Sequence, residues 1–385
     1  MRIRIMHVVD TLETGGLENG VVNLIQRMDP ARFEHIVCAM RNLGPLADRL
    51  PASRVRIMCL DKAALGFSFL AGQLARRIRQ ESPHIVHSRN WGTMEAILAG
   101  WWHRGAALVH SEHGVESADA GSEPIRRRIF RRLVYHLADK VFSVSYQLRD
   151  YHARRTGFPA SRMEVIHNGV DTGRFCPDPS TRDLIRRRLG IRPEEFCIGA
   201  VGRLEPVKDL RTLLRAVAAF PQACTNWRLL IAGDGRDLPA LREFVNSRSE
   251  LQSRIAFLGD VSNIPDVLNA LDTYVISSRS EGISNSLLEA MATGLPVVAS
   301  AVGGNLEVIN EGSGLLFPTE DYHGLAERLL VLRGDSELRR RLGRSALLRV
   351  KQDFSMESMV SNYERLYGSL ATRQATVPLP VTRTG

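Results

Sequence analysis

The 385-residue sequence lacks patterns that mark several classes of protein. It contains no Asp-x-Asp pair, a spacing in which two carboxylates often hold a divalent cation. No apolar run approaches the roughly 18–20 residues that cross a bilayer, so we expect no membrane-spanning segment. The first ten residues, MRIRIMHVVD, are too short and too soon interrupted by charge for a secretory signal peptide.

Cysteine is scarce as well. The five cysteines, an odd number, form no Cys-x-x-Cys pair, and several of them fall in apolar runs. We therefore expect reduced, mostly buried thiols in a cytoplasmic protein rather than a disulfide framework. The cysteines are Cys38, Cys59, Cys176, Cys197 and Cys224.

Aromatic residues make up only 6% of the chain, and few of them are clustered among the basic residues. This argues against a nucleic-acid partner, which needs aromatic stacking surfaces between cations. The net charge is +9, and residues 1–170 hold most of the surplus, with 24 Lys and Arg against 16 Asp and Glu. The first half is therefore expected to face an anionic partner such as a membrane surface.

Short apolar strands alternate with helical patterns along most of the chain, which predicts an α/β protein with parallel sheets. The pattern restarts after the turn Asn-Gly-Val-Asp at 168–171. We therefore expect two doubly wound, Rossmann-like domains, 1–170 and 171–354, facing across a cleft. The tail 371–385 has no core pattern and is expected to be disordered.

Glycines and polar residues follow the predicted strands of the first half, at the sheet edge where such proteins bind ligands. Gly15-Gly16 lies between the first strand and a helix. It either approaches a phosphate or sugar closely, or only makes a tight turn. His113 ends the fifth strand and either donates a hydrogen bond to a sugar hydroxyl or caps backbone carbonyls.

The second half repeats this arrangement. Arg203 and Lys208 follow its first strand and are suited to neutralise a diphosphate, unless they pair with Glu205 and Asp209. Gly-rich turns end the next two strands and would let a flat base lie against the backbone. The glycines concerned are Gly233 and Gly259.

The stretch Ser278–Ala292 is predicted to be a polar turn that enters a helix. The N–H groups of the helix's first turn form an anion site, and Glu281 and Glu289 lie on either side of it. Two carboxylates that grip hydroxyls around a bound phosphate suit a nucleotide sugar. The residues at the helix N-terminus are Ser284, Asn285, Ser286 and Leu287.

The segment 123–135 (EPIRRRIFRRLVY) is strongly basic, and no acid follows Glu123 before Asp139. We expect a helix with Ile125, Ile129, Leu133 and Tyr135–His136 on an inward row and the arginines on its flanks and outer face. That helix is then either a surface that docks on anionic lipid or a solvated face. The arginines are Arg126, Arg127, Arg128, Arg131 and Arg132.

Together these motifs resemble those of the retaining glycosyltransferases of family 4, which have the GT-B fold. The resemblance covers nearly all of residues 1–370, and the branch found with bacterial exopolysaccharide clusters is similar. Its specific parts are Arg203 with Lys208, and Glu281-x7-Glu289 in the context GISNSLLEAMA. The remaining matches are Gly15-Gly16-Leu17-Glu18, His113-Gly114, Asn168-Gly169-Val170-Asp171, Gly202-Arg203-Leu204 and Gly233-Asp234-Gly235.

The resemblance implies transfer of a sugar, with retention, from a nucleotide sugar, expected to be UDP-linked, to a polysaccharide or lipid-linked saccharide. Arg203 and Lys208 would hold the donor diphosphate, and N–H groups of Asn285–Leu287 would complete that site. Glu281 would bind hydroxyls of the donor sugar, and Glu289 those of the ribose. No cofactor and no metal is expected, because these cations replace an Asp-x-Asp pair.

In the first domain, Gly16 would lie against the phosphate or sugar and His113 would contact the sugar. Helix 355–370 would cross back to pack on that domain. Two residues depart from the family pattern. Ile283-Ser284 replaces the Phe-Gly of many relatives beside the sugar pocket, and Asp209 puts an acid where relatives often have glycine.

Two other functions remain open at this point. A nucleotide-sugar epimerase shares the same two-domain fold. A non-catalytic protein that binds membrane or nucleic acid through the basic first half would bind in a salt-sensitive way, whether or not a UDP-sugar is present. Under the transferase hypothesis we expect a cytoplasmic enzyme that attaches to the inner face of the cell membrane.

Overall fold

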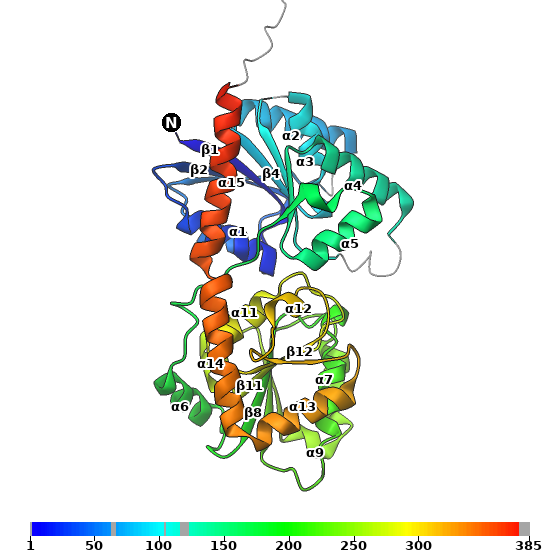
Figure 1. The fold of residues 1–385 in the computed structure, drawn as a ribbon, viewed down its shortest axis with the longest axis vertical. Coiled ribbons are helices and arrows are strands. Elements are labelled where there is room, and N and C mark those ends of the chain that lie inside the picture. Colours follow the sequence, from blue (N-terminus) through cyan, green and yellow to red (C-terminus); the bar gives the residue numbers. More distant parts are fainter. Residues whose placement is uncertain (1, 63–66, 104, 116–122, 377–385) are drawn as a thin grey trace, which may run out of the picture. The chain divides into compact units, whose positions relative to one another are not determined.

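The computed structural model describes residues 2–62, 67–103, 105–115 and 123–376. The chain forms two compact units (Figure 1). Residues 1–167 and 357–385 make up the first unit, and residues 168–356 make up the second. No helix among the described residues is long and apolar enough to cross a bilayer.

The first unit is built on a parallel sheet with the strand order β3-β2-β1-β4-β5-β6-β7. Its central strands β1, β4 and β5 are largely buried on both faces, which is why they are rich in apolar residues, although β4 and β5 end in the buried charged residues Arg89 and Glu112. The strands are β1 (Ile3–Thr11), β2 (Phe33–Asn42), β3 (Val55–Cys59), β4 (Ile85–Arg89), β5 (Ala107–Glu112), β6 (Lys140–Ser143) and β7 (Met163–Val165). The helices are α1 (Gly16–Arg27), α2 (Phe67–Glu81), α3 (Glu95–His103), α4 (Ile125–Leu137), α5 (Tyr146–Thr156) and α15 (Met356–Thr376).

The second unit repeats the design with the parallel order β10-β9-β8-β11-β12-β13. Its strands are β8 (Phe196–Val201), β9 (Trp227–Ala232), β10 (Ile255–Gly259), β11 (Thr273–Ile276), β12 (Val297–Ser300) and β13 (Leu315–Phe317). Its helices are α6 (Pro179–Arg188), α7 (Leu210–Ala218), α8 (Leu238–Asn246), α9 (Ser249–Gln252), α10 (Ile264–Ala270), α11 (Asn285–Ala292), α12 (Asn305–Val308), α13 (Tyr322–Gly334) and α14 (Ser336–Asp353).

The predicted pair of Rossmann-like domains is confirmed by these two sheets. The strand order reverses between β1 and β4 in the first sheet and between β8 and β11 in the second. Ligands of doubly wound sheets bind where the order reverses, beyond the carboxyl ends of the strands. The loops that carry the predicted site residues begin at or beside these two points.

The C-terminal helix differs from the expectation. The prediction ended the helix at residue 370 and made the rest of the chain a disordered tail, whereas α15 continues to Thr376. Residues 377–385 lie outside the described part of the chain. Tyr363, Leu366, Tyr367 and Leu370 of α15 are buried in the first unit, and this packing stabilises the helix.

Candidate functional site

The segment 277–284, here called the donor loop, leads from β11 into α11. The Lys208 ammonium donates to Glu281 Oε1 over 2.6 Å, and the Ser278 hydroxyl donates to the same oxygen over 2.6 Å. Ser277 donates to the backbone carbonyls of Lys208 and Asp209. These bonds tie the loop after β11 to the loop after β8, so two predicted site residues that are 73 positions apart meet.

The alternative pairing of the two cations with their neighbouring acids is wrong. Glu205 instead forms an ion pair with Arg236 at 2.8 Å. Asp209 is buried at the start of α7, where it accepts a hydrogen bond from the Thr212 hydroxyl. Asp209 also forms an ion pair with Arg279 at 3.5 Å, so the acid that departs from the family pattern has its own partners and Lys208 pairs with Glu281.

Arg203 and Lys208 line one small pocket of about 20 Å³ at the end of β8. Ser286, from the first turn of α11, lies on its wall, and its hydroxyl is 2.8 Å from the Tyr274 hydroxyl. Arg203 is exposed and makes no ion pair with any described residue. The pocket thus presents one unpaired guanidinium, one ammonium and a helix N-terminus to the same space, which favours an anion.

Close backbone packing holds the donor loop in place. A side chain at Gly303, whose φ is +48°, would overlap the main-chain oxygen of Glu281. The Gly304 N–H donates to that oxygen over 3.2 Å, and a side chain at Gly304 would overlap the oxygen of Gly282. Only glycine fits at these two positions after β12.

Helix α11 presents its first turn without a side-chain cap, since Ser284 makes no capping hydrogen bond. Asn168 donates from its amide to the carbonyl of Ile283 over 3.1 Å and so fixes the entry into the helix. One turn along, the half-buried Glu289 carboxylate accepts no hydrogen bond from the described residues. Burial raises the pKa of Glu289 to about 7, although Arg174 opposes the shift.

The glycines predicted to face a base lie together at the sheet edge. Gly233, with φ +129°, donates its N–H to the carbonyl of Gly259, and a side chain on it would overlap the main-chain oxygen of Gly202. Gly259 also has a positive φ, of +67°. The carboxyl ends of β8, β9 and β10 therefore lie together at glycines, which have no side chain to cover the backbone.

In the first unit, Gly15 is the residue before α1, and Gly16 is the first residue of the helix. The φ of Gly15 is −156°, which any residue adopts, so conformation does not require glycine there. The Glu18 carboxylate occupies the space where a side chain of Gly15 would lie.

His113 follows β5 and is held from two sides. Its backbone N–H donates to the Asn90 side-chain oxygen over 2.7 Å, and its Nε2 is hydrogen-bonded to the Ser111 hydroxyl at 2.8 Å. Asn90 has φ +57°, a strained conformation for a residue other than glycine. Burial, with the charge of Arg89, lowers the pKa of His113 to about 3, so the ring is neutral at pH 7.

A chain of buried hydrogen bonds continues from this ring. The Ser111 hydroxyl contacts His87 Nε2 at 2.9 Å, and His87 Nδ1 lies 2.7 Å from the Tyr367 hydroxyl of α15. Arg89 is 2% exposed, contacts His7 over 3.0 Å and has no carboxylate within ion-pair distance among the described residues. Burial, and after it the charge of Arg89, lowers the pKa of His7, His87 and His113.

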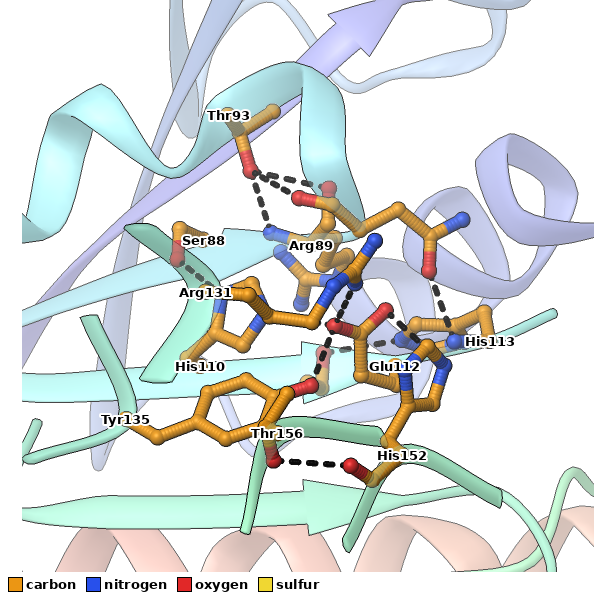
Figure 2. A network of polar contacts seen from close by, with 12 residues as sticks. Ser88, Arg89, Thr93, His110, Glu112, His113, Arg131, Tyr135, His152 and Thr156 are labelled. Atoms are coloured by element: carbon orange, nitrogen blue, oxygen red, sulfur yellow. Dashed lines mark hydrogen bonds and ion pairs between the residues drawn. The ribbon is translucent and has the colours of Figure 1, made fainter. Parts of the chain in front are cut away.

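Next to His113, a second buried cluster is centred on Glu112 (Figure 2). The Glu112 carboxylate pairs with Arg131 and accepts a hydrogen bond from the Tyr135 hydroxyl over 2.7 Å. Burial would raise the pKa of Glu112, but Arg131, followed by His152, holds it well below its usual value. Arg131 also donates to Glu123 over 3.1 Å.

This cluster corrects two predictions about α4. Arg131 is not part of the exposed basic surface, because only 2% of its side chain is exposed. The inward row is wrong for Ile125, Ile129 and Leu133, which are exposed to 62%, 63% and 48%. It is also wrong for the exposed His136, whereas Tyr135 is buried as predicted. Of the predicted basic surface, Arg126 and Arg132 are exposed and two members are half-buried, Arg127 and Arg128.

Several residues that hold the site carried little signal in the sequence. Glu112 is an acid at the end of a buried strand, and such a residue usually has a buried partner. Ser278, Tyr274 and Asn90 are ordinary loop and strand residues whose roles depend on distant contacts. Among the described residues, no group of three or more His, Cys, Asp or Glu side chains is placed to hold a metal ion.

Two family models match the chain. "Glycosyltransferase Family 4" matches residues 14–174, and "Glycosyl transferases group 1" matches residues 195–335. Each match therefore covers much of one unit.

Similar proteins agree with these matches. The chain is 30% identical to the D-inositol 3-phosphate glycosyltransferase of Mycobacterium marinum, over 82% of the chain and 71% of that protein. It is 24% identical to the UDP-Gal:alpha-D-GlcNAc-diphosphoundecaprenol alpha-1,3-galactosyltransferase of Escherichia coli, over 95% and 97% of the two chains.

A solved structure supports the fold. The crystal structure of Anabaena HepE in complex with UDP-glucose matches 96% of this chain and 100% of its own, with a TM-score of 0.80 and 21% identity. With both family models, the full-length relatives and the paired Rossmann-like units in agreement, the chain belongs to the family 4 glycosyltransferases and has the GT-B fold.

Proposed function

We propose that the protein transfers a hexosyl group from a UDP-linked sugar to a saccharide or lipid-linked saccharide, with retention and without a metal ion. One observation carries this proposal. Arg203 and Lys208 line the same pocket beside the uncapped N-terminus of α11, and Lys208 is hydrogen-bonded to Glu281. The name of the E. coli relative contains a UDP-sugar and a diphosphoundecaprenol-linked acceptor, and HepE was crystallised with UDP-glucose.

The donor would lie along the edge of the second sheet. Its diphosphate would contact Arg203, Lys208 and the first turn of α11, where each charge-assisted hydrogen bond contributes about 1.5–3 kcal/mol. Glu281 would accept hydrogen bonds from hydroxyls of the sugar while Lys208 turns toward the phosphates. Glu289 would accept those of the ribose, and the base would lie against the glycine edge formed by Gly233 and Gly259.

In the reaction, the bond from the anomeric carbon to the diphosphate breaks, and a new bond forms to the acceptor oxygen. Negative charge grows on the leaving diphosphate, and the two cations with the helix N-terminus stabilise it. A phosphate oxygen of the leaving group would take the proton of the acceptor hydroxyl. The neutral ring of His113 would hydrogen-bond to the sugar without adding a charge.

The proposed location is the cytoplasm, at the inner face of an anionic membrane if the acceptor is lipid-linked. The exopolysaccharide role implied by the resemblance is part of this proposal. An epimerase of the same fold would change the sugar of the donor with no acceptor present. Product analysis of a donor-only reaction separates the two functions, since a transferase leaves the sugar configuration of the donor unchanged.

The experiment begins with thermal unfolding in the presence of UDP-, GDP- and ADP-sugars. The donor that binds the folded state raises the unfolding temperature, by an amount that follows RT ln(1+[L]/Kd). Transfer by Arg203→Ala and Lys208→Ala is then measured, with Arg211→Ala as a control for an exposed arginine nearby. We expect each site variant to lose about 10- to 150-fold in kcat/KM.

Full activity of both site variants would contradict the proposed donor site. Retention is tested by the anomeric configuration of the product, read by NMR. Metal independence is tested by transfer in the presence of a chelator, and a loss of activity restored by added Mg²⁺ or Mn²⁺ would contradict it.

A further inference from the structure

Helix α4 is packed with Arg131 inward and its row of aliphatic side chains outward. Ile125, Ile129 and Leu133 recur at intervals of four, so they share one face, and about half or more of each is exposed. An ordinary surface helix buries such a row. The face that contacts the sheet carries Arg131 and Tyr135 together with Val134.

Buried contacts fix this rotation of the helix. Arg131 and Tyr135 both bind Glu112 at the end of β5 (Figure 2). Arg131 also binds Glu123, just before the start of the helix. Turning the helix to bury the isoleucines would strand the Glu112 carboxylate without its partners, and an unpaired buried charge is costly. The exposed apolar row is therefore held outward by the fold.

Cations flank this row on both sides. Arg126 and Arg132 are exposed, on opposite sides of the line from Ile125 to Leu133. No acid occurs between Glu123 and Asp139. Helix α3, which contacts α4, ends near Trp102, whose side chain is 85% exposed.

We propose that this face of α4 docks on an anionic lipid bilayer, with the three aliphatic side chains between the lipid head groups and the arginines on lipid phosphates. A helix that lies in the bilayer surface buries its apolar side chains among the lipid chains and keeps cations at the level of the phosphates, and the row on α4 with its flanking arginines has this arrangement. A symmetric dimer through the same face would bring the arginines of the two copies together with no acid to compensate them. The purpose of the docking rests on the proposed function, because it would bring the enzyme to a lipid-linked acceptor.

The test is sedimentation of the full chain with vesicles of phosphatidylcholine alone or mixed with phosphatidylglycerol, with no donor or acceptor present. We expect binding only to the anionic vesicles and release at high salt. Arg126→Gln/Arg132→Gln is expected to weaken binding about 30-fold. Ile125→Gln/Ile129→Gln/Leu133→Gln is expected to weaken it at least about tenfold.

The control is Val331→Gln/Leu348→Gln, which removes comparably exposed aliphatics from the second unit and should leave binding unchanged. Arg131 is left intact because its loss would disturb folding, and circular dichroism verifies that each variant is folded. Because no sugar transfer is measured, the result does not depend on whether the donor site is correct.

Equal binding to neutral vesicles, or unchanged binding by either α4 variant, would overturn the proposal. A second overturning outcome is a wild-type dimer in sedimentation velocity that the Ile125/Ile129/Leu133 variant converts to monomer, with no vesicle binding. That result would assign the face to self-association.

Discussion

Glu289 offers the sharpest test of the second unit, because its half-buried carboxyl has a pKa raised by burial from 4.5 to about 7. The folded state therefore holds a proton that the unfolded chain gives up near pH 4.5. This group lowers the free energy of unfolding as pH rises from about 4.5 to 7, and the loss is complete above pH 7. Above pH 7 the ionisation of Glu289 lowers the free energy of unfolding by about 3 kcal/mol, whereas at pH 5 it lowers it by only about 1 kcal/mol.

Glu289→Gln removes this penalty because the amide stays neutral at every pH. We expect the ligand-free variant to unfold at a temperature roughly 6–12 °C higher than wild type at pH 8, and only about 2–4 °C higher at pH 5. The assay is thermal unfolding at the two pH values. Glu327→Gln is a suitable control, since that carboxylate is 73% exposed and should show no difference at either pH.

The same substitution should weaken donor binding at pH 8, because an amide accepts hydrogen bonds from a ribose less well than a carboxylate does. A gain in stability at pH 8 together with weaker donor binding would show that the protein gives up stability at this position in order to bind the donor. A gain that is equal at both pH values would refute the raised pKa, and unaltered donor affinity would refute the ribose role.

Three further predictions concern packing and positioning. Gly303→Ala should reduce transfer at least about tenfold, measured as kcat/KM, because the added methyl group displaces the donor loop; unchanged kinetics would show that the loop yields freely. Glu112→Gln should destabilise the protein by about 1.5–3 kcal/mol in urea unfolding, since Arg131 loses one of its two buried carboxylate partners and keeps only Glu123; a variant as stable as wild type would contradict the pairing. Tyr367→Phe should lower kcat more than it raises KM, about fivefold, if the hydrogen-bond chain orients His113; a change in thermal stability alone would indicate a structural role.

The sequence was sufficient for the alternation of strands and helices because apolar runs and Gly-containing turns are local features. It also placed Arg203, Lys208 and Glu281 at strand ends, since parallel strands all point their carboxyl ends to one edge. It did not show that Glu205 and Asp209 have other partners. Those pairings depend on residues that are distant in the chain or on the cap of a helix.

Helix α4 marks the limit of sequence reasoning. Its hydrophobic period predicts a helix correctly, and the same period predicts the wrong face inward. The periodicity rule assumes that the protein core is the only apolar environment available to a helix. Here the deciding partner of Arg131 is Glu112, 19 residues earlier and on another element, so only tertiary contacts reveal which side is buried.

By itself, then, the sequence determined the two Rossmann-like units, the edge of each sheet that carries the loops, and the charged residues at that edge that we propose bind a nucleotide sugar. These follow from local patterning and from strand geometry. Only the tertiary structure decided which charges pair, which histidine is held neutral, and which face of α4 meets solvent. Pairing and burial depend on distances between segments that are far apart in the chain. The free energy of burying or pairing a charge therefore cannot be assigned until the fold has set those distances.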